Sequence, residues 1–283
     1  MQLSKGNVNF DYAVHSDFLI HWTGKDLDKS HDPKWYNSPR SETDPTLTDL
    51  YIKRLYNILK FGLWMTEQQE SELSFGDERV SIPPTPKVCF TELKLSESRI
   101  HAKRYGRLGI GVKRRFLFDR SGRPLLYYWY KGWEKNDPFL KACAKELQSK
   151  DLLNFFKPMD SRITQTLTYD FYRESEWRII YFKELLEKKW IKDPRDSNNT
   201  KEHEYFNSLT AEERSKLRYL IPVDGWFAMI IYPSIATKNK GQQEDSTWVK
   251  DQITRIKKLP DRGNSVEGNN WPIELDLDAC RNF

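Results

Sequence analysis

Hydrophobic residues along this chain follow two different periods, which change from one short segment to the next. Phe18–Trp22 is a nearly continuous apolar run interrupted only by His21, and such a run predicts a short buried strand. Leucine and isoleucine then recur at helical spacing between a candidate N-cap at Thr48 and a candidate C-cap at Gly62. This second pattern predicts a helix over 49–61, so the chain is expected to begin with a strand followed by a helix.

A polar stretch at 67–86 separates these two elements from the rest of the chain. It ends in a cluster of prolines, Pro83, Pro84 and Pro86, and is typical of a mobile loop. Beyond it, strand and helix patterns follow one another irregularly. We expect strands at 88–91, 109–112, 124–129, 174–182, 226–232 and 273–277, and helices at 96–105, 139–148, 152–156, after Thr210 and at 246–258.

The irregular order of strands and helices predicts the fold class. It favours an α+β protein with a mixed, irregular central sheet and flanking helices over a repeating βαβ fold. We expect a single domain over residues 1–283, with the motifs that bear chemistry at 15–180. A polar linker at 192–201 would then lead into a C-terminal extension of helices and strands at 201–283.

Composition narrows the class of protein. Aromatic residues make up 14% of the chain, which excludes a disordered polypeptide although charged residues reach 31%. The cysteines Cys89, Cys143 and Cys280 are far apart and lack zinc-site spacing, so neither a disulfide framework nor a metal site is expected. The N-terminus is polar, and no apolar run approaches the roughly 18 residues of a membrane-spanning helix. These features predict a cytoplasmic protein.

The net charge of +5 is concentrated in one segment. From Arg99 to Arg115 the chain contains basic residues and no acidic residue. A polyanion, either a nucleic acid or the pyrophosphate of a nucleotide, is a candidate partner for such a run. The alternative is a solvated helix face with its neighbouring loop. The candidate nucleic-acid-binding residues are Lys103, Arg104, Arg107, Lys113, Arg114 and Arg115.

The first candidate site is the segment His21–Gly24, where a predicted strand enters a loop. A histidine there can donate a hydrogen bond to a ligand hydroxyl, and a glycine lets the backbone approach a ligand closely. The alternative is a buried histidine whose hydrogen bond is satisfied by backbone.

The second candidate site is the segment Glu174–Arg178. On a strand, Glu174, Glu176 and Arg178 share one face, and the intervening residues share the other. Two neighbouring carboxylates repel each other, which raises one pKa, and they can stabilise a cationic transition state. The alternative is an exposed strand face on which Arg178 pairs with Glu176.

Three other motifs are weaker candidates for a catalytic or binding site. Cys89 has no activating base near it in the sequence and is expected to be inert packing. The glycines between Tyr105 and Gly111 lack the spacing of a dinucleotide-binding fingerprint, which excludes a Rossmann site. His203 lies between two glutamates and is expected to be solvated.

The order of several short motifs resembles the AbiGi family of abortive phage resistance proteins. The resemblance implies a phage-defence system in which the protein is described as an antitoxin beside a nucleotidyltransferase-like toxin. The motifs span more than half of the chain and are Phe18-Leu-Ile-His-Trp-Thr-Gly24, Asn57-Ile-Leu-Lys-Phe-Gly-Leu63, Val88-Cys-Phe-Thr-Glu92, Tyr105-Gly-Arg-Leu-Gly-Ile110 and Glu174-Ser-Glu-Trp-Arg178.

A more distant resemblance concerns mechanism. A strand His-x-Thr followed by a helix ending Ile-Leu-x-x-Gly-Leu is similar to the opening of DarT-like ADP-ribosyltransferases, which act on NAD. The resemblance implies that His21 holds the NAD ribose and that Glu174 or Glu176 is the catalytic carboxylate. It implies an aromatic ring, Phe90 or Tyr105, against the nicotinamide. The remaining candidates for NAD binding are Trp22, Thr23 and Gly24 beside His21, with Arg107 or Lys113 at the pyrophosphate.

The sequence is therefore compatible with two functions. One is an NAD-dependent ADP-ribosyltransferase-like effector of phage defence. The other is a non-enzymatic antitoxin or regulator that binds nucleic acid or a toxin partner. They make different demands on the fold, because only the enzyme needs His21 and a late carboxylate in one cleft.

Overall fold

The computed structural model describes residues 17–27, 45–67, 71–75, 78–92, 95–128, 138–161, 169–243, 247–258 and 271–282. Within these residues, one nine-stranded mixed sheet runs in the order β13-β2-β5-β1-β6-β14-β15, with β12 paired to β5 and β7 paired to β12. Every neighbouring pair is antiparallel except β14 and β15. The strands are β1 (Phe18–Thr23), β2 (Leu63–Thr66), β5 (Lys87–Thr91), β6 (Leu108–Lys113), β7 (Arg123–Pro124), β12 (Glu176–Ile180), β13 (Leu217–Ile221), β14 (Phe227–Tyr232) and β15 (Ile273–Asp276). The predicted α+β class with an irregular mixed sheet is confirmed.

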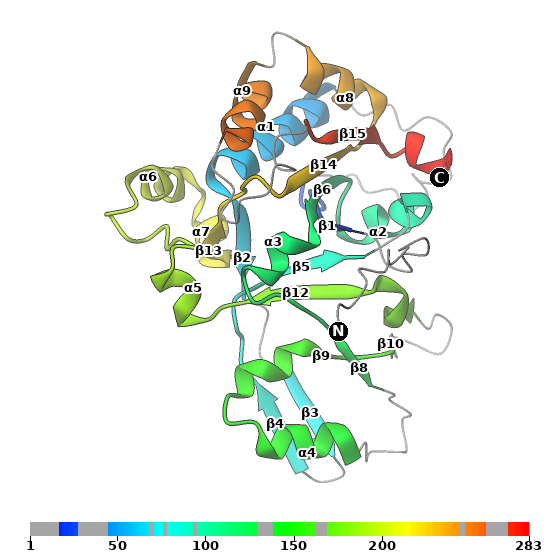
Figure 1. Cartoon of the computed structure of the whole chain (residues 1–283), viewed down its shortest axis with the longest axis vertical. Helices are drawn as coiled ribbons and strands as arrows, with labels where there is room; N and C mark the ends of the chain where they lie inside the picture. Colours follow the sequence, from blue (N-terminus) through cyan, green and yellow to red (C-terminus); the bar gives the residue numbers. More distant parts are fainter. Residues whose placement is uncertain are drawn as a thin grey trace, which may run out of the picture.

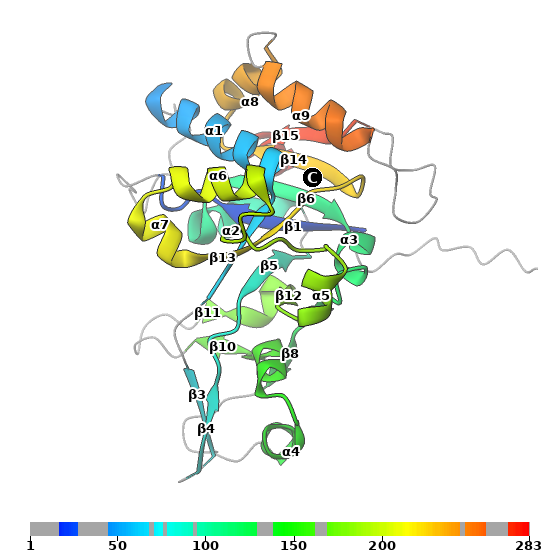
Figure 2. The ribbon, with the colours of Figure 1, turned by 90° about the vertical axis from the view of Figure 1, so that its left-hand side faces the viewer.

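Three helices form a layer on one face of the sheet. Figures 1 and 2 show α1 (Pro45–Phe61), α8 (Ile235–Gln242) and α9 (Thr247–Lys257) lying together above β14 and β6. The predicted helix at 49–61 is confirmed, but it starts earlier, because Pro45 suits the first turn of a helix. Thr48 is therefore not a cap: it lies buried inside α1, and its hydroxyl contacts that of Thr237 on α8 at 3.4 Å.

The opposite face of the same strands is covered by α2 (Ser98–Tyr105) and the short 3-10 helix η7 (Ala279–Asn282). Alternation along β1 sends Leu19 to the helical layer and Ile20 to this second cluster. The connection from α2 to β6 depends on Gly106, which has φ 117. A Cβ atom there would lie 2.2 Å from the carbonyl oxygen of Thr23, so only glycine fits.

A smaller lobe projects from the far side of β12, as Figures 1 and 2 show. In it, β3 (Ser71–Phe75) and β4 (Glu78–Ile82) form a hairpin, and β8 (Leu126–Tyr128) runs parallel to β9 (Phe156–Pro158). Helix α4 (Pro138–Glu146) and the 3-10 helix η3 (Lys150–Phe155) complete it, with Leu73, Leu140 and Leu153 buried between them. The loop expected over 67–86 is wrong for 71–75 and 78–82, which form this hairpin because Leu73, Val80 and Ile82 alternate with polar residues and pack into the lobe.

The C-terminal residues are part of the main sheet. β13 lies at one end of the sheet and β14 and β15 lie at the other. The polar segment at 192–201 pairs with β13 through Lys192 and Leu220 and then enters α6. The remaining described elements are α3 (Arg114–Phe118), β10 (Asp160–Ser161), β11 (Tyr169–Asp170), η2 (Leu95–Glu97), η4 (Phe171–Glu174), α5 (Lys183–Glu187), α6 (Thr200–Ser208) and α7 (Ala211–Lys216). No helix among the described residues has the length and apolar character needed to cross a bilayer.

Candidate functional site

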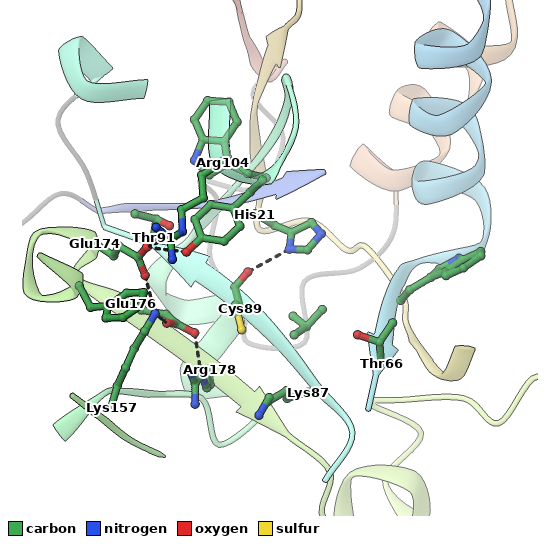
Figure 3. Close-up of a pocket in the computed structure, with 15 residues that line it drawn as sticks. His21, Thr66, Lys87, Cys89, Thr91, Arg104, Lys157, Glu174, Glu176 and Arg178 are labelled. Atoms are coloured by element: carbon green, nitrogen blue, oxygen red, sulfur yellow. Dashed lines mark hydrogen bonds and ion pairs between the residues drawn. The ribbon is translucent and has the colours of Figure 1, made fainter. Parts of the chain in front are cut away.

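A pocket of about 440 Å³ opens where β1, β2, β5 and β12 approach one another. Its walls combine four cationic side chains, two carboxylates and four aromatic rings from segments that are far apart in the sequence (Figure 3). The lining residues are His21, Trp22, Trp64, Thr66, Lys87, Val88, Cys89, Thr91, Arg104, Tyr105, Lys157, Phe171, Glu174, Glu176 and Arg178.

The alternation of β5 and β12 builds one wall of the pocket. Cys89 pairs with Arg178 and Thr91 pairs with Glu176, so these four side chains share one face of the sheet. The intervening residues face the other way, into the main core. The expected division of Glu174–Arg178 into a polar and an apolar face is thus confirmed for the strand, with Val88, Phe90, Trp177 and Ile179 buried on the core side.

Glu174 reaches the same pocket by a different route. It ends the 3-10 helix η4, and the strand begins only at Glu176, two residues later than expected. Ser175 between them has φ 42, in the left-handed region that most residues avoid. The two carboxylates still converge, and both are almost fully buried, at 2% and 6% exposure.

One lysine joins the two carboxylates. The Nζ of Lys157, on β9, lies 2.5 Å from Oε2 of Glu174 and 2.5 Å from Oε2 of Glu176. The remaining oxygens are also bonded: Oε1 of Glu174 accepts from the hydroxyl of Tyr105 at 2.5 Å, and Oε1 of Glu176 accepts from Nε of Arg178 at 2.6 Å. Figure 3 shows Lys157 between the two glutamates. The pocket therefore contains a buried ion network instead of two bare carboxylates.

This network decides the charge state of Glu176. Burial alone would raise the pKa of its carboxyl, but the charges of Arg178 and Lys157 outweigh burial and lower the pKa to about 2. The expectation that mutual repulsion raises a pKa in this pair is therefore wrong for Glu176. The expected pairing with Arg178 is confirmed, although it is buried and not on an exposed face.

A second lysine extends the positive side of the pocket. Lys87 is buried, and its Nζ donates to Oδ1 of Asn154 at 2.8 Å. Burial, and after it the charge of the neighbouring Arg178, lower the pKa of Lys87 to about 8. Arg178 in turn donates to the carbonyl oxygen of Asn154, so Asn154 links both cations.

His21 lies where β1 and β5 separate. The two strands pair at Ile20 and Thr91, and beyond that point Nδ1 of His21 donates a hydrogen bond to the carbonyl oxygen of Cys89 at 2.9 Å. Burial lowers the pKa of His21, and the charge of Arg54 acts in the same direction. The ring is therefore neutral near pH 7 with its proton on Nδ1, which leaves Nε2 as the nitrogen able to accept a hydrogen bond.

The two aromatic residues expected to pack against a nicotinamide, Phe90 and Tyr105, lie in different surroundings. Phe90 is 1% exposed in the main core, with its ring centre 5.8 Å from that of His21, and does not line the pocket. Tyr105 does line it, with its hydroxyl bonded to Glu174. Trp22 also lines it, and its buried Nε1 has no hydrogen-bond partner among the described residues.

Two further residues expected to bind NAD do not line the pocket. The hydroxyl of Thr23 accepts from Arg54 at 3.4 Å. Gly24 has φ 97 and packs against the ring of Tyr51, where a Cβ atom would lie 2.4 Å from Cε1. Gly24 is thus needed for the packing of this turn.

The basic run from Arg99 to Arg115 is divided among several environments. Arg104 lines the pocket and lies 3.6 Å from Glu174, whereas Arg107 is buried outside it. Arg114 bonds to Glu92 at 2.6 Å, Arg115 bonds to Asp119 at 2.7 Å, and Lys103 and Lys113 are half-buried. Of the six candidate nucleic-acid-binding residues, only Arg104 lines the pocket.

Other chemistry at the pocket is limited. Burial, and after it the charge of Glu176, raise the pKa of the Cys89 thiol to about 12, so the thiol stays protonated and unreactive. Within the part of the chain that the structure describes, no group of histidine, cysteine and acidic residues could hold a metal ion. His203 is half-buried, with Nδ1 3.2 Å from the carbonyl oxygen of Pro194. The expectation that it is solvated is therefore wrong.

Five pocket residues were not singled out by sequence reasoning. Lys87 alternates with Cys89 and Thr91 on the pocket face of β5, and this period-two pattern could have revealed it. The others come from segments without a recognisable motif, and they meet the carboxylates only through the tertiary fold. They are Trp64, Thr66, Lys157 and Phe171.

Comparison with known families gives one match. Residues 63–220 match the family described as "Putative abortive phage resistance protein AbiGi, antitoxin". No curated protein and no solved structure shows significant similarity. The matched region covers more than half of the chain and contains every lining residue of the pocket except His21 and Trp22. The likeness to ADP-ribosyltransferases has no support beyond the residues that carry it.

Proposed function

The chain belongs to the AbiGi family of abortive phage resistance antitoxins, and from this premise we propose that it acts as an antitoxin whose pocket binds a nucleotide of the NAD class. Family membership supports the role in phage defence and implies a toxin as partner. The pocket supports the nucleotide. The single observation that carries the proposal is that His21, Tyr105, Glu174 and Glu176 meet in one pocket with four cationic side chains.

The donors and acceptors of the pocket fit such a ligand. A pyrophosphate requires fixed cations, which Lys87, Arg104 and Arg178 supply. Ribose hydroxyls require acceptors, and Nε2 of His21 is one. The buried N–H of Trp22 lacks a partner among the described residues, and a small shift of its neighbours would offer it to a ligand oxygen. The pocket volume of about 440 Å³ lies in the range of roughly 300–1,000 Å³ that ligand pockets occupy.

A second candidate function is ADP-ribosyl transfer from NAD, which would make the chain an effector. The convergence of His21 with Glu174 and Glu176 favours it, since a carboxylate against the ribose stabilises the cation that forms as the nicotinamide bond breaks. The ion pairs of both carboxylates oppose it, because their charge is already balanced in the folded state. Nucleotide binding is therefore the first proposed function of the pocket, and catalysis is the second.

Nucleotide binding is tested by isothermal titration with NAD, ADP-ribose, AMP and nicotinamide. The three phosphate-bearing compounds should bind and nicotinamide should not. Lys87→Gln keeps the hydrogen bond to Asn154 but removes the charge, and it should weaken NAD binding by roughly 10-fold or more. Lys183→Gln is the matched control, because Lys183 is 79% exposed and outside the pocket. Equal affinity in both variants, or no binding by wild type, would overturn the nucleotide proposal.

The antitoxin role is tested in cells that carry the neighbouring toxin gene. Expression of the chain should restore growth, and cells lacking it should stop growing when the toxin is induced. Lys87→Gln should restore growth less well than Lys183→Gln if the nucleotide is required for neutralisation. Growth arrest that the wild-type chain cannot relieve would contradict the antitoxin role.

A further inference from the structure

Lys157 reaches the carboxylate pair from outside the main sheet. It belongs to β9, which pairs with β8 in the smaller lobe, whereas Glu176 belongs to β12 of the main sheet. Its Nζ lies 2.5 Å from each carboxylate and 4.4 Å from the centre of the Phe171 ring, and its side chain is 12% exposed. An ammonium group in this position is held on three sides by groups that attract a cation.

We propose that the pocket has a latent capacity to cleave the nicotinamide–ribose bond of NAD and that Lys157 suppresses it. This inference rests on the proposed nucleotide-binding function. It adds a chemical role for a residue that no sequence motif marks, and it assigns Glu174 as the carboxylate that would act once the ammonium group is absent.

The reaction is a hydrolysis. The bond between C1′ of the ribose and the nicotinamide nitrogen breaks, and its electron pair leaves with nicotinamide. A water oxygen bonds to C1′, its proton passes to solvent, and the products are ADP-ribose and nicotinamide. The transition state carries positive charge at C1′, so a carboxylate beside it accelerates the reaction and an ammonium group beside it slows the reaction.

The geometry of the ion network gives Lys157 this control. Glu176 has a second cationic partner, Arg178, whose Nε lies 2.6 Å from its other carboxylate oxygen. Among the described residues, Glu174 has no other cation as close as Lys157, since Arg104 lies at 3.6 Å and Tyr105 is a neutral donor. Removing the ammonium group therefore frees negative charge mainly on Glu174.

The chain offers a graded set of variants at this position. Lys157→Met removes the charge and keeps the length of the side chain. Lys157→Gln also removes the charge but can still donate hydrogen bonds to the buried carboxylates, which protects the fold if the methionine variant unfolds. Lys157→Arg keeps the charge and is the matched control. The double variant Lys157→Met with Glu174→Gln tests the assignment of Glu174.

The test measures release of nicotinamide from NAD by chromatography, with NAD binding and thermal melting followed on the same samples. Wild type and Lys157→Arg should release nicotinamide at the uncatalysed rate. Lys157→Met or Lys157→Gln should release it on the order of 100-fold faster, and adding Glu174→Gln should abolish the gain. If the neutral variants bind NAD and melt cooperatively but release no nicotinamide, the latent activity is refuted while nucleotide binding stands. If wild type does not bind NAD, the proposed nucleotide function fails first.

Discussion

The Nδ1 of His21 donates a hydrogen bond to the carbonyl oxygen of Cys89 over 2.9 Å, at the point where β1 and β5 separate. Backbone carbonyls inside a sheet are normally satisfied by the next strand. Here β1 pairs with β5 at Thr91 and β2 pairs with it at Lys87, so the edge between them faces the pocket. The imidazole thus replaces a strand-to-strand hydrogen bond, and its structural role and its position in the pocket follow from the same gap.

His21→Ala should destabilise the protein, because it leaves the Cys89 carbonyl without its partner. The expected loss in unfolding free energy is about 1–3 kcal/mol, the usual cost of a buried polar group left unpaired. His21→Asn, which can donate through its amide, should lose less. Urea denaturation of the three proteins checks the order, and an alanine variant as stable as wild type would contradict it.

The pH dependence of stability gives a second measurement at the same residue. The folded-state pKa of His21 is lowered mainly by burial, so below a pH of about 6.5 the unfolded chain binds the extra proton more readily. Wild type should therefore lose stability as pH falls from 7 towards 5, and His21→Ala should show a smaller change. Equal slopes in the two proteins would show that other groups cause the pH dependence.

Gly106→Ala should be among the most damaging single changes. The new Cβ atom would lie 2.2 Å from the carbonyl oxygen of Thr23, and φ 117 is unfavourable for any other residue. We expect a loss of more than about 3 kcal/mol or failure to fold. Ser121→Gly is the matched control, since Ser121 also has a positive φ of 56 and should gain up to about 1 kcal/mol. Thermal melts of both variants decide the point.

Much of the fold could be predicted because the local pattern and the tertiary structure agree. The strand containing His21, the helix ending before Gly62 and the strand at 227–232 all lie close to their expected positions. Short strands with little pattern were missed. β2 has only four residues and follows Gly62 directly, which is too short a run to show a strand pattern. The hairpin at 71–82 was hidden by polar residues and by the prolines that follow it.

The candidate site could be predicted only in part. His21 and Glu176 were found because each lies on a strand with a recognisable local motif, and the fold brings both to one pocket. Lys157 could not be found this way. It lies 17 positions before Glu174 in a short strand with no motif, and its two ion pairs depend on how the smaller lobe packs on the main sheet. The charges that surround the carboxylates therefore could not be predicted from the sequence, since they depend on that packing.

Binding of nucleic acid by the basic run is expected to be weak. Each phosphate contact made by a charged residue changes the slope of log affinity against log salt by about one. Arg115 is 59% exposed, whereas Arg107 is 7% exposed and Arg114 is paired with Glu92. Arg115→Glu should therefore lower the slope by about one at most in filter-binding titrations with duplex RNA and DNA. A larger fall would show that Arg115 is needed for more than one phosphate contact.

Glu176→Gln should remove a large part of the loss of stability that the protein undergoes in acid, and the sign follows from the pKa of Glu176. The folded-state value is about 2 against an ordinary 4.5, since Arg178 and Lys157 overcome the opposing effect of burial. A depressed carboxyl pKa stabilises the folded state above pH 4.5, and this stabilisation disappears as pH falls from 4.5 towards 2. A shift of this size corresponds to roughly 3 kcal/mol, and removing one partner of a buried ion pair typically costs about 3–5 kcal/mol.

The measurement compares urea midpoints at pH 7 and pH 3 for wild type, Glu176→Gln and the control Glu187→Gln. Glu187 is 57% exposed and pairs with Lys183 one helical turn away, so its variant should differ from wild type by less than about 0.5 kcal/mol at either pH. Wild type should lose much more stability between the two pH values than Glu176→Gln, which starts lower at pH 7 and has no charge left to lose at this position. If wild type and Glu176→Gln lose the same amount of stability, the buried network does not hold Glu176 ionised. The charge of Glu176 is then not balanced by Arg178 and Lys157 before a ligand binds.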